Sequence, residues 1–290
     1  MIDLHIHSKY SAGTDEVEAI LRQAEALNLN IISITDHNTV IQYEDVKKHR
    51  HLFSGKVVTG CELTTYYQNE LIDILAYGYD IDKFRTEIDK HVMSFFERRE
   101  MEVGMLIKHF KKLGFIINED EIEYLHDQDI SLKAFFRALL KHPKNVAYFS
   151  EPEVTFKIFA RNYLFNSSSE LFVDFSKSFP SLKRLCKMIH NAGGLVFVAH
   201  PFMYHIDVIK SLDDMVANYD IDGIECFHTT FNDEQTLALL EYTKEKGLYR
   251  SGGSDYHGTN KLEHNLKTGK GNMRISAALV NEWLKPEMVL

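Results

Sequence analysis

The chain has 290 residues, of which 44% are hydrophobic and 26% charged, so it is large enough for one globular α/β domain with an insertion. Its 42 acidic and 33 basic residues give a formal net charge of −9, which argues against an extended nucleic-acid-binding surface but allows a small phosphorylated substrate. Three widely separated cysteines, no signal-peptide pattern and no apolar run long enough to cross a bilayer predict a cytoplasmic protein without membrane contact.

Short β-branched runs bounded by turn residues predict seven strands. In chain order they cover residues 2–7, 30–37, 56–63, 71–80, 194–201, 222–228 and 248–255. Between the first two strands, a helix is expected from one apolar stripe with helical spacing, formed by Val17, Ile20, Leu21, Ala24 and Leu27. Asp15, followed by Glu18, is its expected N-cap. Further helices are expected at residues 181–194 and 232–247, each ending in glycine.

The middle of the chain differs because strand signals fade and helical patterns replace them. Helices are expected within residues 91–114, 129–142 and 155–165. The alternation of strands and helices on either side indicates an α/β fold with a parallel sheet, open or closed as a barrel. We therefore predict a discontinuous α/β domain, residues 1–83 and 186–290, interrupted by a helical insertion domain, residues 84–185.

Each predicted strand carries, at or near its end, side chains that can bind metal ions. Because the carboxyl ends of parallel strands meet at one face of an α/β domain, we expect these side chains to lie together. Imidazoles and carboxylates without thiolates fit zinc, manganese or iron and not a zinc finger. The candidates are His5, His7, Asp36, His37, Glu62, Asp73, His200, Glu225, His228, Asp255 and His257.

The segment DLHIHS at residues 3–8 alternates histidine with apolar residues. Side chains at i and i+2 of a strand point to the same side, so His5 and His7 can bind one ion. Taken alone, the pair is weak evidence for a metal site, and two histidines on a strand edge are the better explanation. Asp255 and His257 repeat the spacing, which favours a metal site.

The remaining histidines and Cys226 are expected to have structural or solvent-exposed roles. Cys226 could serve as a thiol nucleophile, but its position in a strand predicts a small hydrophobic core residue. His190 is expected on a helix, and His205 and His264 in loops. Solvated positions are expected for His49, His51, His91, His109, His126 and His142.

The motifs DLHIHS, TDHNT, GCEL, AHP, GIECFH and SGGSDYHG, in this order, resemble those of the PHP (polymerase and histidinol phosphatase) family. The resemblance covers about residues 1–80 and 188–260. The middle region, with RRE at residues 98–100 and NYLF at 162–165, is similar to the helical insertion of the subgroup that includes nucleoside-phosphate phosphatases and small-RNA exonucleases. The family implies a distorted (β/α)7 TIM-like barrel with two or three divalent metal ions, zinc, manganese or iron, in its mouth.

The resemblance also implies roles for individual residues. The ligands of the first ion would be His5, His7, Glu62 and Asp255, and those of the second Glu62, His200 and Asp73. The third would be bound by His37, His257 and a residue of the loop that follows His7, and Asp36 would complete the catalytic group. The expected substrate-binding residues are Arg98, Arg99, Lys133 and His228.

Three positions depart from the pattern of the subgroup. Ala12 stands where an SDG triplet has aspartate, and alanine cannot ligate; Asp15 could replace that ligand. Asp73 stands where histidine is usual, and its harder oxygen donor would favour manganese or iron. Leu132 and Ala134 stand where relatives carry an Arg-x-His pair that holds the substrate.

The resemblance therefore implies a metal-dependent phosphoesterase. It would hydrolyse a phosphomonoester, or a phosphodiester of a short nucleotide, by attack of a metal-activated hydroxide on phosphorus. A histidinol-phosphate phosphatase is a second hypothesis within enzymes. A third, prompted by Ala12 and Asp73, is a catalytically weakened PHP domain that acts as a binding or regulatory module.

Overall fold

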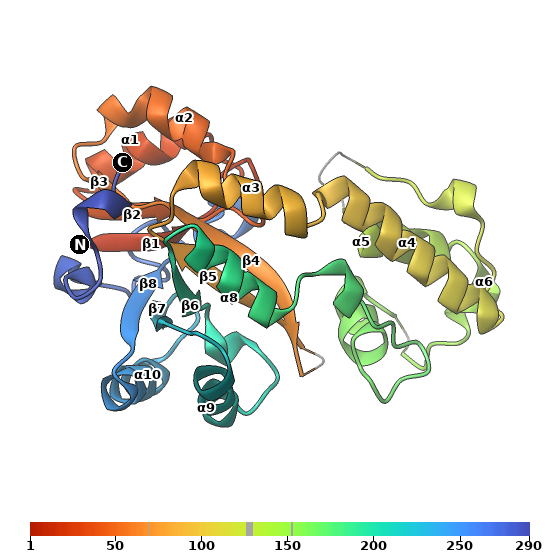
Figure 1. Ribbon diagram of the computed structural model, residues 1–290. Coiled ribbons are helices and arrows are strands. Elements are labelled where there is room, and N and C mark those ends of the chain that lie inside the picture. The colour runs from red at the N-terminus through yellow and green to blue at the C-terminus, as the bar shows by residue number, and fades with distance from the viewer. Residues whose placement is uncertain (69, 126–129, 152) are drawn as a thin grey trace. The chain divides into compact units, whose positions relative to one another are not determined.

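The computed structural model of the chain describes all residues except 69, 126–129 and 152 (Figure 1). The chain divides into two compact units, residues 1–92 with 180–290, and residues 93–179. The boundaries expected from the sequence, residues 84 and 185, both fall inside the first unit, within the helices α3 (Ile81–His91) and α8 (Leu182–Asn191). His126 lies outside the described residues.

The first unit contains two sheets. The three-stranded sheet is parallel throughout, in the order β1 (Ile2–Ile6), β2 (Ile31–Ile34) and β3 (Lys56–Val57). The five-stranded sheet follows the chain order: β4 (Gly60–Tyr67), β5 (Glu70–Tyr77), β6 (Leu195–Val198), β7 (Gly223–His228) and β8 (Tyr249–Gly253). In it, β5 is antiparallel to both of its neighbours, whereas β6, β7 and β8 are parallel.

The structure confirms the expected α/β class but does not confirm a closed barrel. The described residues form a mixed α/β fold, and no closed barrel of seven parallel strands is found among them. Single bridges, Ile6 to Tyr256 and His37 to Glu62, link the edges of the two sheets. The run 56–63 is divided between β3 and β4, which belong to different sheets. Only residues 68 and 69 separate β4 from β5, too few for the crossover that a parallel pair requires.

Six α-helices of the first unit surround its sheets. In α1, four residues of the predicted stripe are buried, and Leu27 is half-buried. The expected cap is wrong, because Glu16 occupies the N-cap position without a side-chain bond and Asp15 makes other contacts. Figure 1 shows α1 and α2 together, and α10 beside β7 and β8. The helices are α1 (Val17–Ala26), α2 (Gln42–His49), α3, α8, α9 (Val208–Asn218) and α10 (Asp233–Lys246).

Two apolar clusters hold the strands of the first unit in place. The larger one packs Ile20, Ile34, Ile74 and Val198 with their neighbours between the sheets and the helices. In the second, the segment after β8 covers β1 and β5, and Trp283 stacks on Tyr77 at a ring distance of 5.7 Å. Burying such large side chains is worth roughly 1.5–3 kcal/mol each, so both clusters fix the strands whose ends carry the polar candidates.

The second unit is helical. Its longest helix, α4 (Phe95–Lys112), starts with a capping box between Ser94 and Glu97, and Gly114 follows it with a φ of +86°. Phe110 packs against Phe135 and Phe159 in an aromatic core. The other described elements are α5 (Ser131–Leu140), α6 (Pro143–Val146), α7 (Phe156–Ile158), a π-helix (Phe159–Leu164) and two 3-10 helices (Glu119–Glu121 and Ser176–Ser178).

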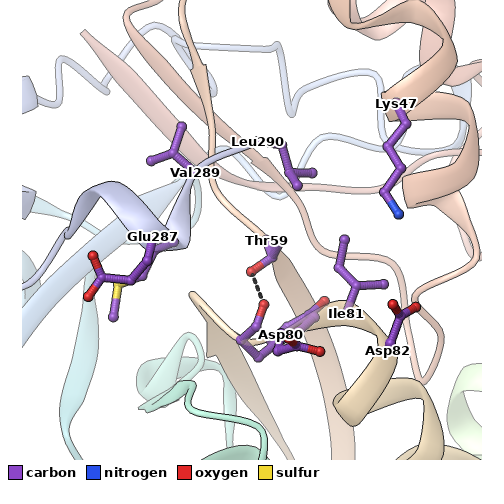
Figure 2. A pocket seen from close by; sticks show the side chains of 10 residues that line it. Lys47, Thr59, Asp80, Ile81, Asp82, Glu287, Val289 and Leu290 are labelled. Atoms are coloured by element: carbon purple, nitrogen blue, oxygen red, sulfur yellow. Dashed lines mark hydrogen bonds between the residues drawn. The ribbon is translucent and has the colours of Figure 1, made fainter.

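A cavity of about 250 Å³ lies where the C-terminal segment meets α2 and the start of α3. Figure 2 shows Lys47, Asp82 and Glu287 around it, with the Thr59 hydroxyl donating a hydrogen bond of 2.9 Å to the carbonyl of Tyr79. None of the candidate site residues lines this cavity. In the described part of the chain, no helix combines the length and apolar character needed to cross a membrane.

Candidate metal centre

Four candidate ligands gather near the ends of β1 and β8 and the start of β4. His5 lies in β1 and His7 just beyond it, Glu62 lies in β4, and Asp255 follows β8. All four are buried. Glycine permits this approach, because a Cβ atom at Gly253 would lie 2.2 Å from the backbone nitrogen of His5. Asp255 adopts a φ of +54°, a strained value that in native proteins clusters at functional sites.

Four side chains form a first donor set. The Nε2 atoms of His5 and His7 lie 3.1 Å apart, and Glu62 Oε2 lies 3.2 Å from the first and 3.1 Å from the second. Asp255 Oδ1 lies 3.6 Å from His5 Nε2 and 3.4 Å from His7 Nε2. Four ligands at about 2.05 Å around a tetrahedral ion would lie about 3.3 Å from one another. The donors are therefore spaced as the edges of a coordination polyhedron, and the residues fit a divalent ion.

The histidines of this set present lone pairs to one another. His5 Nδ1 donates to Glu225 Oε1 at 2.9 Å. Ser11 Oγ donates to Asp36 and so must accept from His7 Nδ1, 3.2 Å away. In each neutral ring the hydrogen is thereby assigned to Nδ1, which leaves the Nε2 lone pair available. Two acceptor nitrogens 3.1 Å apart repel unless a cation lies between them, which again fits a metal ion.

The two oxygens of Glu62 face different groups. Whereas Oε2 faces the first donor set, Oε1 lies 2.8 Å from His200 Nε2. His5, Glu62 and His200 offer ligand atoms within 4.8 Å of one another, and so do His37, Glu62 and Asp73. Asp73 is in mid-strand on the antiparallel β5, paired with Thr64, and reaches the cluster from the neighbouring strand. Glu62 would thus offer one oxygen to each of two donor groups.

A third group lacks a carboxylate. His7, His37 and His257 offer ligand atoms within 4.8 Å, with ring centroids 4.6 Å and 4.2 Å from that of His7. Ala12 has no side chain that could bind a metal ion. Its backbone carbonyl accepts a hydrogen bond from the side chain of Asn260. Asp15 belongs to none of the ligand groups among the described residues; it accepts bonds from Gln23 and Tyr256 beside α1.

Electrostatic interactions keep the central carboxylates ionised. Burial opposes the charge of Glu62, but His5, His37 and His200 lower its pKa well below its ordinary range. Burial also opposes the charge of Asp255, but interactions with His228, His264 and His7 lower its pKa well below the ordinary range. Asp73 differs, because burial and the neighbouring charge of Glu62 raise its pKa to about 6. Burial opposes protonation of His5, His7 and His200, but Glu62 and the neighbouring carboxylates raise the pKa of all three above the ordinary value. The cluster therefore attracts positive charge, as bound protons or as a metal ion.

A family comparison accounts for this arrangement. The model of the PHP domain matches residues 3–251, which include every candidate ligand except Asp255 and His257. The chain belongs to the PHP domain family. It is an enzyme, a metal-dependent phosphoesterase of that family.

Curated relatives match this PHP domain over most of its length. A 5′-3′ exoribonuclease of Haemophilus influenzae is 26% identical over 259 residues, covering 88% of this chain and 89% of the relative. A phosphoribosyl 1,2-cyclic phosphate 1,2-diphosphodiesterase of Eggerthella lenta is 23% identical over 258 residues, covering 88% and 94%.

Solved structures support the fold. A protein from Bifidobacterium adolescentis, described as a metal-dependent phosphoesterase, aligns with a TM-score of 0.65 at 23% identity, over 97% of this chain and 94% of that chain. An amidohydrolase from Chromobacterium violaceum aligns with a TM-score of 0.61 at 20% identity, over 89% and 87%.

Glu225 supports the metal centre of this PHP domain without belonging to any of its ligand groups. One oxygen accepts from His5 Nδ1, and the other accepts from the backbone N–H of His200 at 2.8 Å. A carboxylate behind a ligating histidine fixes the ring and raises its basicity. Sequence reasoning placed Glu225 at a strand end but gave it no role of this kind.

We expect Glu225→Gln to weaken metal binding by about 10- to 100-fold, the usual effect of losing such a supporting carboxylate. Equilibrium titration of metal-free protein with Mn²⁺, followed by electron paramagnetic resonance of the free ion, measures it. Glu234→Gln, an exposed change at the start of α10, is the control and should bind like the wild type. An unchanged affinity in Glu225→Gln would contradict the supporting role.

Asp36 and Asp3 are buried carboxylates that hold backbone segments. Asp36 accepts from the backbone N–H and hydroxyl of Ser8 and from Ser11, which fixes the loop after β1. Asp3 accepts from the backbone N–H and hydroxyl of Ser254, next to Asp255. Asp36 belongs to no ligand group in the described structure, so its predicted catalytic role acts through Ser11 and His7.

The predicted substrate-binding residues separate into two groups. His228 ends β7 and lies 3.4 Å from Asp255 Oδ2, inside the centre. The others belong to the helical unit and contact side chains there: Arg98 lies 3.7 Å from Glu102, Arg99 3.8 Å from the Tyr124 ring centroid, and Lys133 5.8 Å from the Phe156 ring centroid. Their role in binding substrate stays a prediction.

Two residues beside Asp255 carried no functional prediction. Lys261 Nζ lies 2.6 Å from Asp255 Oδ2, and His264 Nδ1 lies 3.4 Å from the same oxygen. Their loop follows the motif SDYHG, but no periodicity marks which of its side chains turns inward. Cys226, in contrast, is buried against Thr243, and burial raises the pKa of its thiol to about 12, which disfavours a nucleophile.

Proposed function

We propose that this PHP domain hydrolyses a phosphate ester of a small, nucleotide-like substrate by attack of a water-derived nucleophile on phosphorus, with two or three zinc, manganese or iron ions as cofactors. The observation that carries the proposal is the spacing of the first donor set, together with the two-sided contacts of Glu62. The names of the curated relatives, an exoribonuclease and a cyclic phosphate diphosphodiesterase, support a phosphodiester of a short nucleotide as the first substrate to test.

In this proposal, some residues of the centre hold the metal ions and others orient the ligating histidines. His5, His7, Glu62 and Asp255 would hold one ion. Glu62 with His200 and Asp73 would hold a second; His200 groups with His5 and Glu62, and Asp73 with His37 and Glu62. His37 and His257 would hold a third, next to His7. Bound divalent ions supply Lewis-acid chemistry, since they lower the pKa of a water molecule and polarise phosphoryl oxygens. Glu225, through His5, and Asp36, through Ser11 and His7, keep two rings oriented during the reaction.

The test compares two chromogenic esters. Protein stripped of metal and reloaded with Mn²⁺, Fe²⁺ or Zn²⁺ is assayed with bis(p-nitrophenyl) phosphate, a diester, and with p-nitrophenyl phosphate, a monoester. We expect turnover of at least one ester with at least one metal, and a higher kcat/KM for the diester. Short 5′-phosphorylated oligonucleotides and histidinol phosphate are then assayed as natural-type substrates. No turnover of any of these esters with any metal would refute the proposal.

The second candidate is a catalytically weakened enzyme that acts as a regulatory module, because the third group contains imidazoles alone and Ala12 offers no ligand. Metal analysis by inductively coupled plasma mass spectrometry separates the two. If the protein is an active phosphoesterase, we expect about two or three metal ions per chain together with ester hydrolysis. A folded protein that binds no ion and hydrolyses nothing would favour the module.

A further inference from the structure

The two oxygens of Asp255 face different surroundings. Oδ1 faces the first donor set, and His257 Nδ1 also lies 3.3 Å from it. Oδ2 faces Lys261 Nζ at 2.6 Å and His228 Nε2 and His264 Nδ1 at 3.4 Å each. Three nitrogen atoms, one from the end of β7 and two from the loop that follows Asp255, therefore surround one oxygen on the side away from the first donor set.

The tautomer of His228 follows from its other nitrogen. The backbone N–H of Thr230 donates to His228 Nδ1 at 3.2 Å, and the Thr230 hydroxyl lies 2.8 Å from the same atom. A nitrogen that accepts a hydrogen bond carries no hydrogen, so the hydrogen of this ring is assigned to Nε2. His228 Nε2 is buried and, within the described part of the chain, has no hydrogen-bond partner.

The tautomer of His264 follows in the same way. Its Nδ1 lies 3.1 Å from the backbone carbonyl oxygen of Asp255, which can only accept, so Nδ1 carries a hydrogen. Nitrogens that carry hydrogens cannot ligate a cation. His228, Asp255 and His264 lie close enough together to resemble a metal site, but their protonation favours a site for oxygen anions instead.

Lys261 supplies the positive charge at this place. It binds Asp255 Oδ2 with one of its three N–H bonds, and its side chain is 36% exposed, so the remaining two can reach a ligand. Its loop is fixed by bonds from Asn260 to the Ala12 carbonyl and from the Thr259 backbone N–H to Thr14 Oγ1, 2.8 Å and 3.0 Å long. Lys261 is thus held beside the donor set by its own bond to Asp255 and by the bonds of Thr259 and Asn260 to the loop 12–14.

We propose that Lys261 and His228 form a phosphoryl-binding subsite next to the first donor set, in which Lys261 Nζ and His228 Nε2–H donate to non-bridging oxygens of the bound phosphoryl group. The inference rests on the proposed function and specifies the residues that bind its substrate. Asp255 links the two parts, because Oδ1 faces the ligands of the ion and Oδ2 orients the lysine that contacts the phosphoryl group.

Binding of inorganic phosphate to the metal-loaded protein tests the subsite by isothermal titration calorimetry. We expect Lys261→Met, which keeps the length of the side chain but removes its charge, to raise the Kd for phosphate by about 10- to 100-fold, the effect of losing one charge-assisted hydrogen bond. Lys261→Arg should retain most of the affinity. In the ester assay, Lys261→Met should raise KM by a similar factor.

Lys270→Met is the matched control, because Lys270 lies in the same region and pairs with the exposed Glu263. It should bind phosphate like the wild type, and metal content should be equal in all four proteins. A wild-type Kd in Lys261→Met, or an equal loss in Lys270→Met, would overturn the subsite. So would a lower metal content in Lys261→Met, since Lys261 would then act only through Asp255.

The phosphate measurement is independent of turnover. If the wild type binds phosphate through Lys261 but hydrolyses no ester, the proposed function fails and the subsite stands. If esters are hydrolysed and Lys261→Met binds phosphate normally, the subsite alone fails.

Discussion

Replacing Glu62 with glutamine is expected to lower kcat/KM for ester hydrolysis by at least about a thousandfold, equivalent to about 4 kcal/mol of transition-state stabilisation. Glu62 contacts both the first donor set and His200, so a single change removes a negative ligand from two positions. The amide of glutamine is neutral and offers only one oxygen. Steady-state kinetics with the better of the two chromogenic esters measures the loss, and metal analysis should show fewer ions per chain.

Glu18→Gln makes the same chemical change on the surface of α1, where Glu18 pairs with Arg22. Exposed pairs of this kind contribute at most about 1 kcal/mol to stability, so this variant should keep its activity and its metal. Far-ultraviolet circular dichroism establishes that both variants are folded. If Glu62→Gln retained more than about a tenth of the wild-type kcat/KM, Glu62 would not be the shared ligand.

Removal of the metal ions is expected to abolish turnover and to lower the melting temperature of the first unit. Without a metal ion, the buried Glu62 loses its divalent partner, and the two nitrogens of His5 and His7, 3.1 Å apart, have only a proton to share. Ions that bind only the folded state add about 4 kcal/mol at a thousandfold excess over Kd. For a chain of this length, such a gain corresponds to a shift on the order of 10 °C, which differential scanning calorimetry of metal-free and reloaded protein measures.

Two controls accompany the melting experiment. The helical unit, which holds none of the candidate ligands, should melt at the same temperature in both samples if its transition is resolved. Glu62→Gln should show a smaller response to added metal than the wild type. Equal melting temperatures and equal activities of stripped and loaded wild type, with metal removal verified, would exclude ions as part of the folded enzyme.

The strands that carry the site could be predicted from the sequence because each depends on its own residue composition and on the turn residues that flank it. The runs around His5, Ile32, Val198, Ile224 and Gly252 are β-branched or apolar and end at turn residues, and all became strands. The spacing of His5 and His7 predicted that their rings would meet, because strand alternation needs no information about the rest of the fold.

The pairing of the strands could not be predicted in the same way. The antiparallel direction of β5 depends on the two-residue connection to β4, and the division between β3 and β4 depends on which sheet each joins. Asp73 therefore reaches the centre from mid-strand and not from a carboxyl end. Asp15 is the opposite case, because it is close to His7 in sequence but does not join the metal centre. Its carboxylate accepts hydrogen bonds from Gln23 and Tyr256 instead.

The sequence by itself determined the ligand types and the family of this protein, because spacing along strands and order of motifs are local properties of the chain. Only the tertiary structure decided which nitrogen of each histidine faces the donor set. Glu225, 220 residues away in the chain, binds His5 Nδ1, and the local loop conformation brings Ser11 to His7 and Thr230 to His228. The same holds for Lys261, whose contact with Asp255 depends on how loops 12–14 and 258–261 meet.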